Sequence, residues 1–320
     1  AKYGVPQGSV LGPILFLLYS ADVLQLIKRH QLHPHAFADD SQIYGFCQPS
    51  ETDSLQECLS DCIDDVSQWM RANRLQLNST KTEILWCSSA RRQHQIPTRP
   101  VRVGSASIVP VSSVRDLGVF IDSDVTLKAH VTATVRACFA ALRQIRSVRR
   151  FLSPQALLTL IRALVVSKVD YCNSVLVGIS GHLQNRLQSV FNAAARLVFS
   201  ARTSDHVTPL LRELHWLRIP ERIQFRLCVL AYRCLNGMAP SYLADSLHLV
   251  ADVDSRRHLR SAGTSTLVIQ STRRSTLGDR AFPVAASRAW NSLPPSIRAA
   301  TSLTTFRRKL KAHLFQSSFD

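Results

Sequence analysis

The chain has 320 residues, 46% of them hydrophobic, and a formal net charge of +17. This length suffices for one large or two ordinary domains, whereas no stretch reaches the roughly 18 charge-free apolar residues that a membrane-spanning helix needs. No signal-peptide pattern is present either. The basic balance favours a polyanionic partner, most often nucleic acid or an anionic membrane surface, although a solubilising surface accounts for the charge equally well.

The charge is unevenly distributed along the chain. Residues 1–70 contain three basic and nine acidic residues, a net charge of −6, so the remaining residues carry +23. An acidic head followed by a basic body suits a cation-binding site joined to a surface that binds phosphates. The eight cysteines lack the paired spacing of a zinc site, and we expect reduced thiols that serve as small core residues.

The first part of the chain predicts both helices and strands. Residues 13–29 form an apolar helical pattern that begins with a proline, which the first turn of a helix tolerates. Residues 35–38 and 41–46 predict two strands on either side of Asp39 and Asp40. The two carboxylates are therefore expected at the tip of a hairpin.

A long helix and several short strands are predicted next. Ser54 and Glu57 have the spacing of a capping box, and apolar residues recur at helical spacing from there to about Asn73. The pattern that follows predicts four short strands and a basic loop. The strands are expected near residues 75–77 and 84–86, around a turn at 78–80, and, after the loop at 90–100, at 101–109 and 114–121.

From Thr126 onward the pattern is helical. On a helical wheel, four arginines fall within about a quarter of the circumference, beside an apolar arc. The arginines are Arg136, Arg143, Arg146 and Arg150, and the arc contains Val131, Val135, Leu142 and Ile145. Such a stripe suits a nucleic-acid backbone, because each neutralised phosphate releases counterions, but it also suits a solvated helix face.

Prolines and a glycine mark the ends of further helices. Pro154 and Pro220 predict helix starts, and Gly237 predicts a helix stop. Residues 251–279 are polar and basic without periodicity, which predicts a linker. Residues 301–315 predict a final amphipathic helix with a basic face.

Asp39 and Asp40 are the clearest candidates for chemistry. Adjacent carboxylates repel each other, and they persist easily where a divalent cation neutralises them. Mg²⁺ prefers oxygen ligands and is commonly held by one or two carboxylates together with substrate phosphates. The pair alone is weak evidence, since Asp-Asp also occurs in ordinary turns.

Four short motifs give this pair a context. They are residues 4–13 (Gly-Val-Pro-Gln-Gly-Ser-Val-Leu-Gly-Pro), 37–40 (Phe-Ala-Asp-Asp), 78–83 (Asn-Ser-Thr-Lys-Thr-Glu) and 117–122 (Leu-Gly-Val-Phe-Ile-Asp). This ordered series resembles the reverse transcriptases of LINE-type, jockey-like non-LTR retrotransposons, as a C-terminal fragment from the Pro-Gln-Gly motif onward. Phe37 stands where many relatives have Tyr. Residues 281–295 also resemble the region that follows the polymerase palm in these elements.

The resemblance implies a fold and a reaction. The fold is α+β: an incomplete polymerase palm with a mixed sheet and helices (residues 1–124), a helical thumb (125–250) and a helical basic C-terminal extension (251–320). The reaction is template-directed nucleotidyl transfer by a two-metal mechanism with Mg²⁺ or Mn²⁺. The implied partners are an RNA template, a DNA primer and deoxynucleoside triphosphates, with a nuclear site of action and no membrane. The oligomeric state stays open.

The resemblance also assigns roles to particular positions. They are catalysis and metal binding for Asp39 and Asp40, nucleotide or template contact for Gln7, Gly8 and Lys81, and the primer grip for Leu117 and Gly118. The arginine stripe is expected to lie along the nucleic-acid backbone.

One departure from the family pattern bears on activity. The family's other metal-binding aspartate lies before the Pro-Gln-Gly motif, and Asp22, within the predicted helix after that motif, does not correspond to it. We therefore expect that the chain alone does not polymerise DNA. Two alternatives remain at this stage: a non-catalytic remnant that binds nucleic acid, and a decayed reading frame without function.

Overall fold

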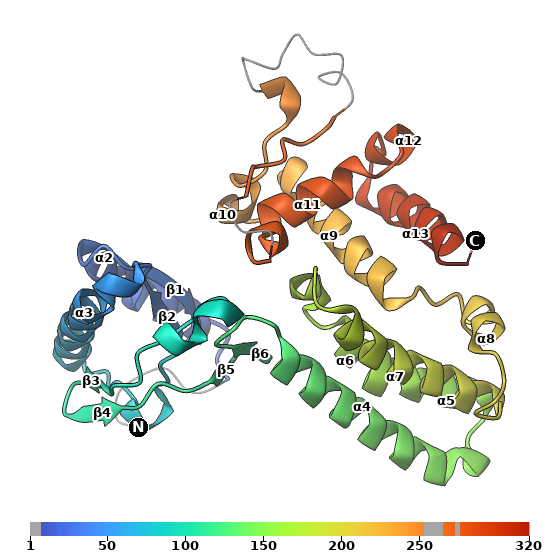
Figure 1. The fold of residues 1–320 in the computed structure, drawn as a ribbon, viewed down its shortest axis with the longest axis horizontal. Helices are drawn as coiled ribbons and strands as arrows, with labels where there is room; N and C mark the ends of the chain where they lie inside the picture. The colour runs from blue at the N-terminus through green and yellow to red at the C-terminus, as the bar shows by residue number, and fades with distance from the viewer. Residues whose placement is uncertain (1–7, 253–264, 273–275, 320) are drawn as a thin grey trace. The chain divides into compact units, whose positions relative to one another are not determined.

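The structure, a computed structural model, describes residues 8–252, 265–272 and 276–319. The chain divides into two compact units (Figure 1). The N-terminal unit comprises Ala1–Val114 with Asp122–Asp124, and the helical unit comprises Arg115–Ile121 with Val125–Asp320. Within the described residues, no helix combines the length and apolar character needed to cross a membrane.

The N-terminal unit combines helices with short strands. Its helices are α1 (Gly12–Tyr19), α2 (Ala21–Arg29) and α3 (Thr52–Ala72), with the 3-10 helices η1 (Pro49–Glu51), η2 (Ser79–Lys81) and η3 (Ala90–Gln95). Its strands are β1 (His33–Phe37), β2 (Asp40–Tyr44), β3 (Val101–Val103) and β4 (Ala106–Ile108), while β5 (Ser113–Asp116) and β6 (Val119–Asp122) contain residues of both units. This mixture of helices and small sheets confirms the predicted combination of α and β structure.

The single mixed sheet expected within residues 1–124 is not found among the described residues. The strands pair instead as three separate two-stranded sheets, β1–β2, β3–β4 and β5–β6. The strands predicted near residues 75–77 and 84–86 are wrong. The Val111 N–H donates to the Ile84 carbonyl at 2.8 Å, but an isolated hydrogen bond does not build a ladder. The alternating apolar residues of these segments lie half-buried in irregular chain.

A serine side chain interrupts the first predicted helix. The pattern over residues 13–29 predicts one helix, whereas the structure has α1 and α2, separated at Ser20. The Ser20 hydroxyl donates to the Phe16 carbonyl at 2.8 Å. A serine that bonds back to the carbonyl four residues earlier competes with the backbone ladder and bends a helix.

The long helix α3 begins slightly earlier than predicted. The capping box belongs to η1, where the Glu51 carboxylate accepts from the Gln48 N–H at 3.0 Å, so Ser54 and Glu57 lie inside α3 and do not cap it. The apolar face of α3 packs on α2, as its helical spacing predicts. The main cluster of buried apolar residues in the N-terminal unit consists of Val23, Ile27, Leu32, Cys62 and Val66.

The helical unit contains the two larger core clusters. Its elements are α4 (Lys128–Val148), η4 (Arg149–Phe151), α5 (Pro154–Ile161), the π-helical η5 (Arg162–Val166), α6 (Ser167–Asp170), η6 (Asn173–Leu176), α7 (Gly181–Phe199), α8 (Val207–Glu213), α9 (Ile219–Leu235), α10 (Ser241–Ala244), η7 (Val250–Asp252), η10 (Gly278–Arg280), α11 (Phe282–Asn291), α12 (Pro295–Arg298) and α13 (Leu303–Phe319). α4 packs along α7, and α9 packs against α11 and α13 (Figure 1). The helix starts predicted at Pro154 and Pro220 and the stop at Gly237 are confirmed.

Three aromatic rings hold α9, α11 and α13 together. Phe306 stacks on Tyr232 and Trp290, with ring centroids 4.5 and 5.6 Å apart, and all three side chains are buried. The Trp290 Nε1–H donates to the Ser265 carbonyl at 2.8 Å, and the Tyr232 hydroxyl donates to the Ala300 carbonyl at 3.0 Å. Both polar atoms are thereby satisfied inside the core.

The C-terminal predictions hold in the described part of the chain. In α13, Phe306, Leu310 and Leu314 are buried while the basic residues 307–309 are exposed, which confirms the amphipathic helix. Of the linker predicted at 251–279, residues 253–264 and 273–275 lie outside the described residues. Within the described part of that linker, Leu267 forms an isolated β-bridge with Leu249.

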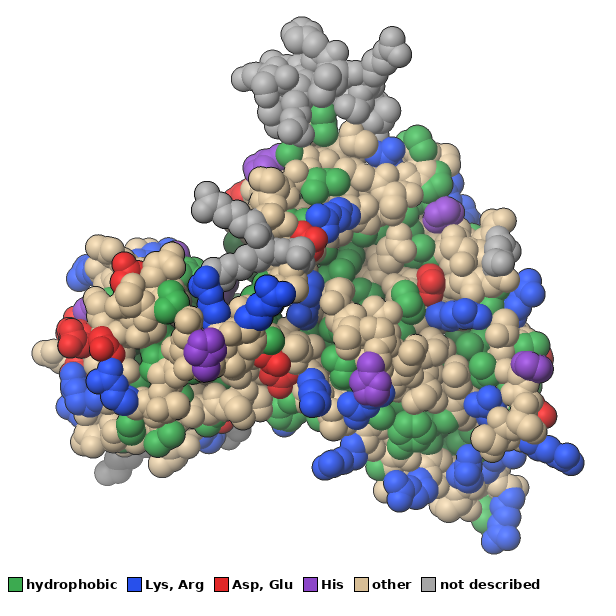
Figure 2. Space-filling view, viewed as in Figure 1, with side chains coloured by type: hydrophobic (Ala, Val, Ile, Leu, Met, Phe, Trp, Pro, Cys, Tyr) green, Lys and Arg blue, Asp and Glu red, His purple; other side chains and the backbone are tan. Residues whose placement is uncertain are grey.

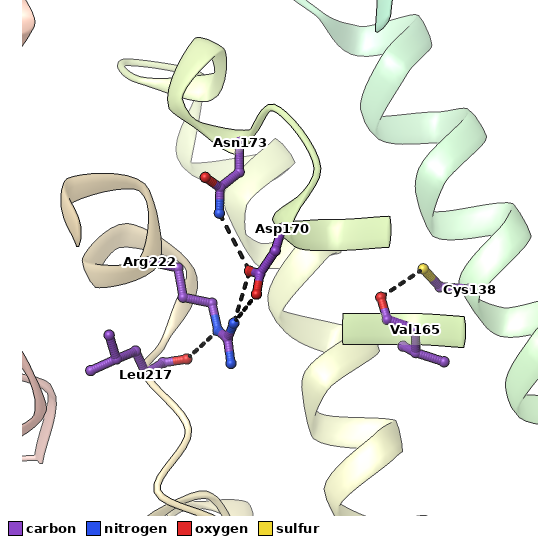
Figure 3. A network of polar contacts seen from close by, with 6 residues as sticks. All are labelled: Cys138, Val165, Asp170, Asn173, Leu217 and Arg222. Atoms are coloured by element: carbon purple, nitrogen blue, oxygen red, sulfur yellow. Dashed lines mark hydrogen bonds and ion pairs between the residues drawn. The ribbon is translucent and has the colours of Figure 1, made fainter. Parts of the chain in front are cut away.

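A mostly buried ion pair joins α6 to α9. Arg222 donates to both carboxylate oxygens of Asp170, at 2.8 and 2.7 Å, and to the Leu217 carbonyl at 3.0 Å (Figure 3). Its guanidinium carbon also lies 4.3 Å from the centroid of the Phe191 ring. The Arg222 and Asp170 side chains are 13% and 22% exposed. Because a charge held this far from water is costly unless it is paired, each side chain depends on the other.

Half of the cysteines are small core residues, as predicted. All eight are free thiols, and Cys62, Cys138, Cys228 and Cys234 are buried. Burial raises the pKa of Cys62 and Cys138 to about 11 and that of Cys228 to about 12. These thiols therefore stay protonated at neutral pH and pack as small apolar side chains.

Candidate functional site

A tight turn closes the β1–β2 hairpin and carries the paired carboxylates. The two strands are antiparallel with Phe37 opposite Asp40, so Ala38 and Asp39 form a two-residue loop. Ala38 has a φ of 54°, the left-handed sign that the first loop residue of a type II′ hairpin turn requires. Asp39 lies in the loop, Asp40 begins β2, and both residues are exposed. The predicted hairpin is confirmed, with both carboxylates open to solvent.

One face of this hairpin carries a row of rings that the sequence analysis did not identify. His33 and His35 stack on Tyr44, with ring centroids 5.3 and 5.6 Å apart. Phe37, two residues further along β1, is 65% exposed. Opposite residues of an antiparallel pair lie on the same face, so Asp40 shares this face with the rings. The two-residue spacing of positions 33, 35 and 37 was the signal that could have revealed it.

The carboxylates have the donor chemistry of a magnesium site but form only part of one. Neither the Asp39 nor the Asp40 carboxylate has a hydrogen bond or ion pair within the described part of the chain. Among the described residues, no group of three or more His, Cys, Asp or Glu side chains is placed to hold a metal ion. Two exposed carboxylates still fit Mg²⁺, because this ion keeps several water ligands and takes others from substrate phosphates.

The described candidates Gly8 and Lys81 form no hydrogen bond or ion pair with the hairpin carboxylates. Gln7 lies outside the described residues, and Gly8, with a φ of 88°, is exposed just before α1. Lys81 is exposed at the end of η2, in a turn where the Thr80 hydroxyl donates to the Asn78 side chain at 2.6 Å. Within the described part, no hydrogen bond or ion pair involves the Lys81 ammonium group. The Lys81 ammonium group is therefore accessible for binding a phosphate.

Leu117 and Gly118, which belong to the helical unit, form the turn of the β5–β6 hairpin. Their φ values are 43° and 87°, and a left-handed pair of central residues is the mark of a type I′ turn. The Tyr171 hydroxyl donates to the Leu117 carbonyl at 2.6 Å. A Cβ atom added to Gly118 would lie 3.2 Å from the Tyr171 ring. The turn is therefore held against Tyr171, which follows α6.

Replacing Gly118 by Ala is expected to lower the free energy of unfolding by about 1–2 kcal/mol, because a side chain in the left-handed region is strained and would press on Tyr171. Urea unfolding of the chain measures the loss. Gly104→Ala is the matched control, since Gly104 also has a positive φ but open space around it. Equal losses in the two variants would show that the Tyr171 contact contributes nothing.

The four arginines of the predicted stripe lie on one exposed surface. Arg136, Arg143 and Arg146 are on α4 and Arg150 is on η4, and all four residues are exposed. The opposite face of α4 is buried through Val131, Leu142 and Ile145, while Val135 is half-buried. The helical-wheel prediction of a basic face beside an apolar arc is confirmed.

Comparison with known proteins shows which proteins the chain is similar to. Residues 1–121 match the family described as reverse transcriptase (RNA-dependent DNA polymerase). "Probable RNA-directed DNA polymerase from transposon X-element" of Drosophila melanogaster is 30% identical over 66% of this chain and 23% of the relative. These matches support a similarity of the chain to the reverse transcriptases of LINE-type, non-LTR retrotransposons.

Two further relatives of the chain come from similar elements. "Probable RNA-directed DNA polymerase from transposon BS" of Drosophila melanogaster is 27% identical over 69% of the chain and 25% of the relative. "RNA-directed DNA polymerase from mobile element jockey" of Drosophila funebris is 28% identical over 41% of the chain and 14% of the relative. The chain thus spans a quarter or less of the length of these relatives, and no solved structure matches it.

The segment that matches the reverse transcriptase family holds most of the candidate site. Asp39, Asp40, Lys81, Leu117 and Gly118 all lie within residues 1–121. The arginine stripe lies beyond this segment. The support for a role of the stripe therefore lies in its own charge and exposure.

Proposed function

We propose that the Asp39–Asp40 hairpin is part of a reverse transcriptase active site that extends a DNA primer on an RNA template. The supporting observation is the exposed pair of carboxylates on a two-residue turn, inside the segment that matches the family. The proposed substrates are deoxynucleoside triphosphates, used with Mg²⁺ or Mn²⁺. The proposed site of action is the nucleus, which the family resemblance implies.

The chemistry follows from the two carboxylates. Asp39 and Asp40 would hold the divalent cations, which supply activation of the primer 3′-hydroxyl and charge neutralisation on the leaving pyrophosphate. The hairpin's own contribution is positional. A two-residue loop between paired strands restricts the backbone on both sides, so the backbone positions of both aspartates are fixed before the substrates bind.

The other family positions have proposed roles in the same reaction. Gln7 and Gly8 would contact the template or incoming nucleotide, Lys81 would pair with its phosphates, and Leu117 with Gly118 would support the primer. Residues 1–124 would then represent a partial palm, 125–250 a thumb and 251–320 a basic extension. The exposed ammonium of Lys81 and the fixed Leu117 turn support these roles.

We further propose that the chain alone does not polymerise DNA. The two carboxylates supply at most part of a two-metal ligand set, and the described residues add no third ligand beside them. The missing ligand would come from another part of a complete polymerase.

Primer extension on an RNA template tests both proposals. The chain is assayed alone and joined to the upstream polymerase segment of a full-length LINE-type reverse transcriptase, with Mg²⁺ and all four deoxynucleoside triphosphates. The expected result is that the joined protein extends the primer and the unjoined chain does not. Extension by the unjoined chain would contradict the partial ligand set, and no extension by a folded joined protein would contradict the catalytic proposal.

A second candidate function is nucleic-acid binding without chemistry. It is favoured by the four exposed arginines of the stripe, which need no metal ion to bind phosphates. Binding that falls steeply with salt and is unchanged by EDTA would support this alternative when primer extension is absent.

A further inference from the structure

Five arginines line a shallow hollow in the helical unit. They are Arg146, Arg149, Arg150, Arg196 and Arg202, from the C-terminal ends of α4 and α7 and the segments that follow them. The hollow has a volume of about 670 Å³, and no carboxylate is among its described lining residues. Figure 2 shows Lys and Arg side chains gathered at the lower right, where Figure 1 places this end of α4.

Two of these arginines are fixed by the protein. Arg149 donates to the Val198 carbonyl at 3.5 Å and to the Ser200 hydroxyl, and Arg196 donates to the Asp205 carbonyl at 3.1 Å. The Nε atoms of Arg149 and Arg196 are nevertheless buried without a hydrogen-bond partner. These two Nε atoms are closed to solvent, so the groups open to an oxygen ligand are the exposed guanidinium groups of Arg146, Arg150 and Arg202.

The charge of the hollow is not neutralised by the protein. In the described part of the chain, none of the five guanidinium groups forms an ion pair with a carboxylate. The nearby Asp205 carboxylate accepts instead from the Arg202 backbone N–H, at 2.6 Å. Guanidinium groups bind phosphate oxygens through pairs of parallel hydrogen bonds, so an anion of this class is the matching ligand.

We propose that the hollow binds backbone phosphates of a nucleic-acid strand that also runs along the arginine stripe. Arg146 and Arg150 belong to both surfaces, which makes the basic surface continuous. From Arg136 to Arg150 this surface is about 20 Å long at the helical rise of 1.5 Å per residue. Several phosphates of one strand can occupy that length, whereas a single small anion can occupy only the hollow.

This proposal rests on nucleic-acid binding, as the proposed function does, and adds a contact surface outside residues 1–121. It needs neither catalysis nor a metal ion. Binding measured in EDTA without nucleotides therefore tests the hollow separately, while primer extension tests the polymerase proposal.

The test compares two double variants that remove the same charge. Arg150→Gln/Arg202→Gln changes two exposed arginines of the hollow, and Arg307→Gln/Arg308→Gln changes two exposed arginines of α13. Each protein is titrated with a labelled single strand of about 12 nucleotides, as RNA and as DNA, at several salt concentrations. Urea unfolding establishes that both variants are folded.

The hollow variant is expected to bind about tenfold more weakly than the unchanged chain, with the slope of log K against log salt reduced by about 1.4, since each strand phosphate contributes about 0.7. The α13 variant is expected to bind as the unchanged chain does. Equal losses in both variants, or none in the hollow variant, would overturn the proposal. So would a mononucleotide that binds as tightly as the strand, because the ligand would then be a small phosphate.

Discussion

Primer extension is expected to fall at least about a thousandfold when Asp39 is replaced by Asn in the joined polymerase. The change keeps the shape of the side chain but removes the charge and one anionic oxygen that a divalent cation needs. A thousandfold loss corresponds to about 4 kcal/mol of transition-state stabilisation, a reasonable share of what a metal ion supplies in phosphoryl transfer. The exposed turn gives Asp39 no hydrogen bond within the described chain, so folding should be unaffected.

Single-turnover extension at saturating template–primer measures this effect, with nucleotide incorporation as the readout. Asp40→Asn is expected to reduce the rate as well, because both carboxylates share one turn. Glu57→Gln is the matched control: Glu57 is an exposed carboxylate of α3 in the same unit, and its loss should leave the rate unchanged. Full activity of Asp39→Asn would exclude this residue from the metal site.

Replacing Arg222 by Met is expected to lower the free energy of unfolding by about 3–5 kcal/mol, because it leaves the Asp170 carboxylate in a mostly buried place without its partner. Stabilities of whole domains are about 5–15 kcal/mol, so this single change removes a large part of the total. The variant also loses the bond to the Leu217 carbonyl and the contact with Phe191. Urea unfolding followed by circular dichroism measures the loss.

A second variant separates the ion pair from simple packing. In Asp170→Leu/Arg222→Met the unpaired charge is gone, so most of the lost stability should return. Arg143→Gln, at an exposed position of α4, should change stability by less than about 0.5 kcal/mol. A double variant as unstable as Arg222→Met alone would show that the stability comes from packing around the guanidinium and not from the charge pair.

Predictions from local patterns were the successful ones. The β1–β2 hairpin, α3, α4 and α13 each follow from periodicity, turn residues or helix-end signals within one short stretch of chain. The single mixed sheet failed because pairing between distant strands is not encoded in the alternation of any one of them. Residues 75–77 and 84–86 alternate as a strand would, yet their surroundings offer no partner edge for a ladder.

In the candidate site, too, local features were predicted and features that combine distant segments were not. The Asp39–Asp40 turn was predicted in place, because a two-residue loop between strands is a local feature. The arginine hollow could not be predicted, since it combines the ends of α4 and α7, which are far apart in the sequence. Two of its five arginines, Arg146 and Arg150, lie in the stripe predicted from the helical wheel, whereas Arg149, Arg196 and Arg202 are brought beside them only by the packing of the helices.

The small hairpin β5–β6 has a consequence for how this protein can be divided. Its residues Arg115–Ile121 precede the helices in sequence but fold with them, since the Leu117 carbonyl accepts from Tyr171 and the Phe120 N–H donates to His130 Nδ1 at 3.4 Å. A shortened protein that starts at Val125 would lack the contacts of this hairpin with Tyr171 and His130. Recombination between related elements would exchange an intact helical module only when the crossover falls upstream of β5.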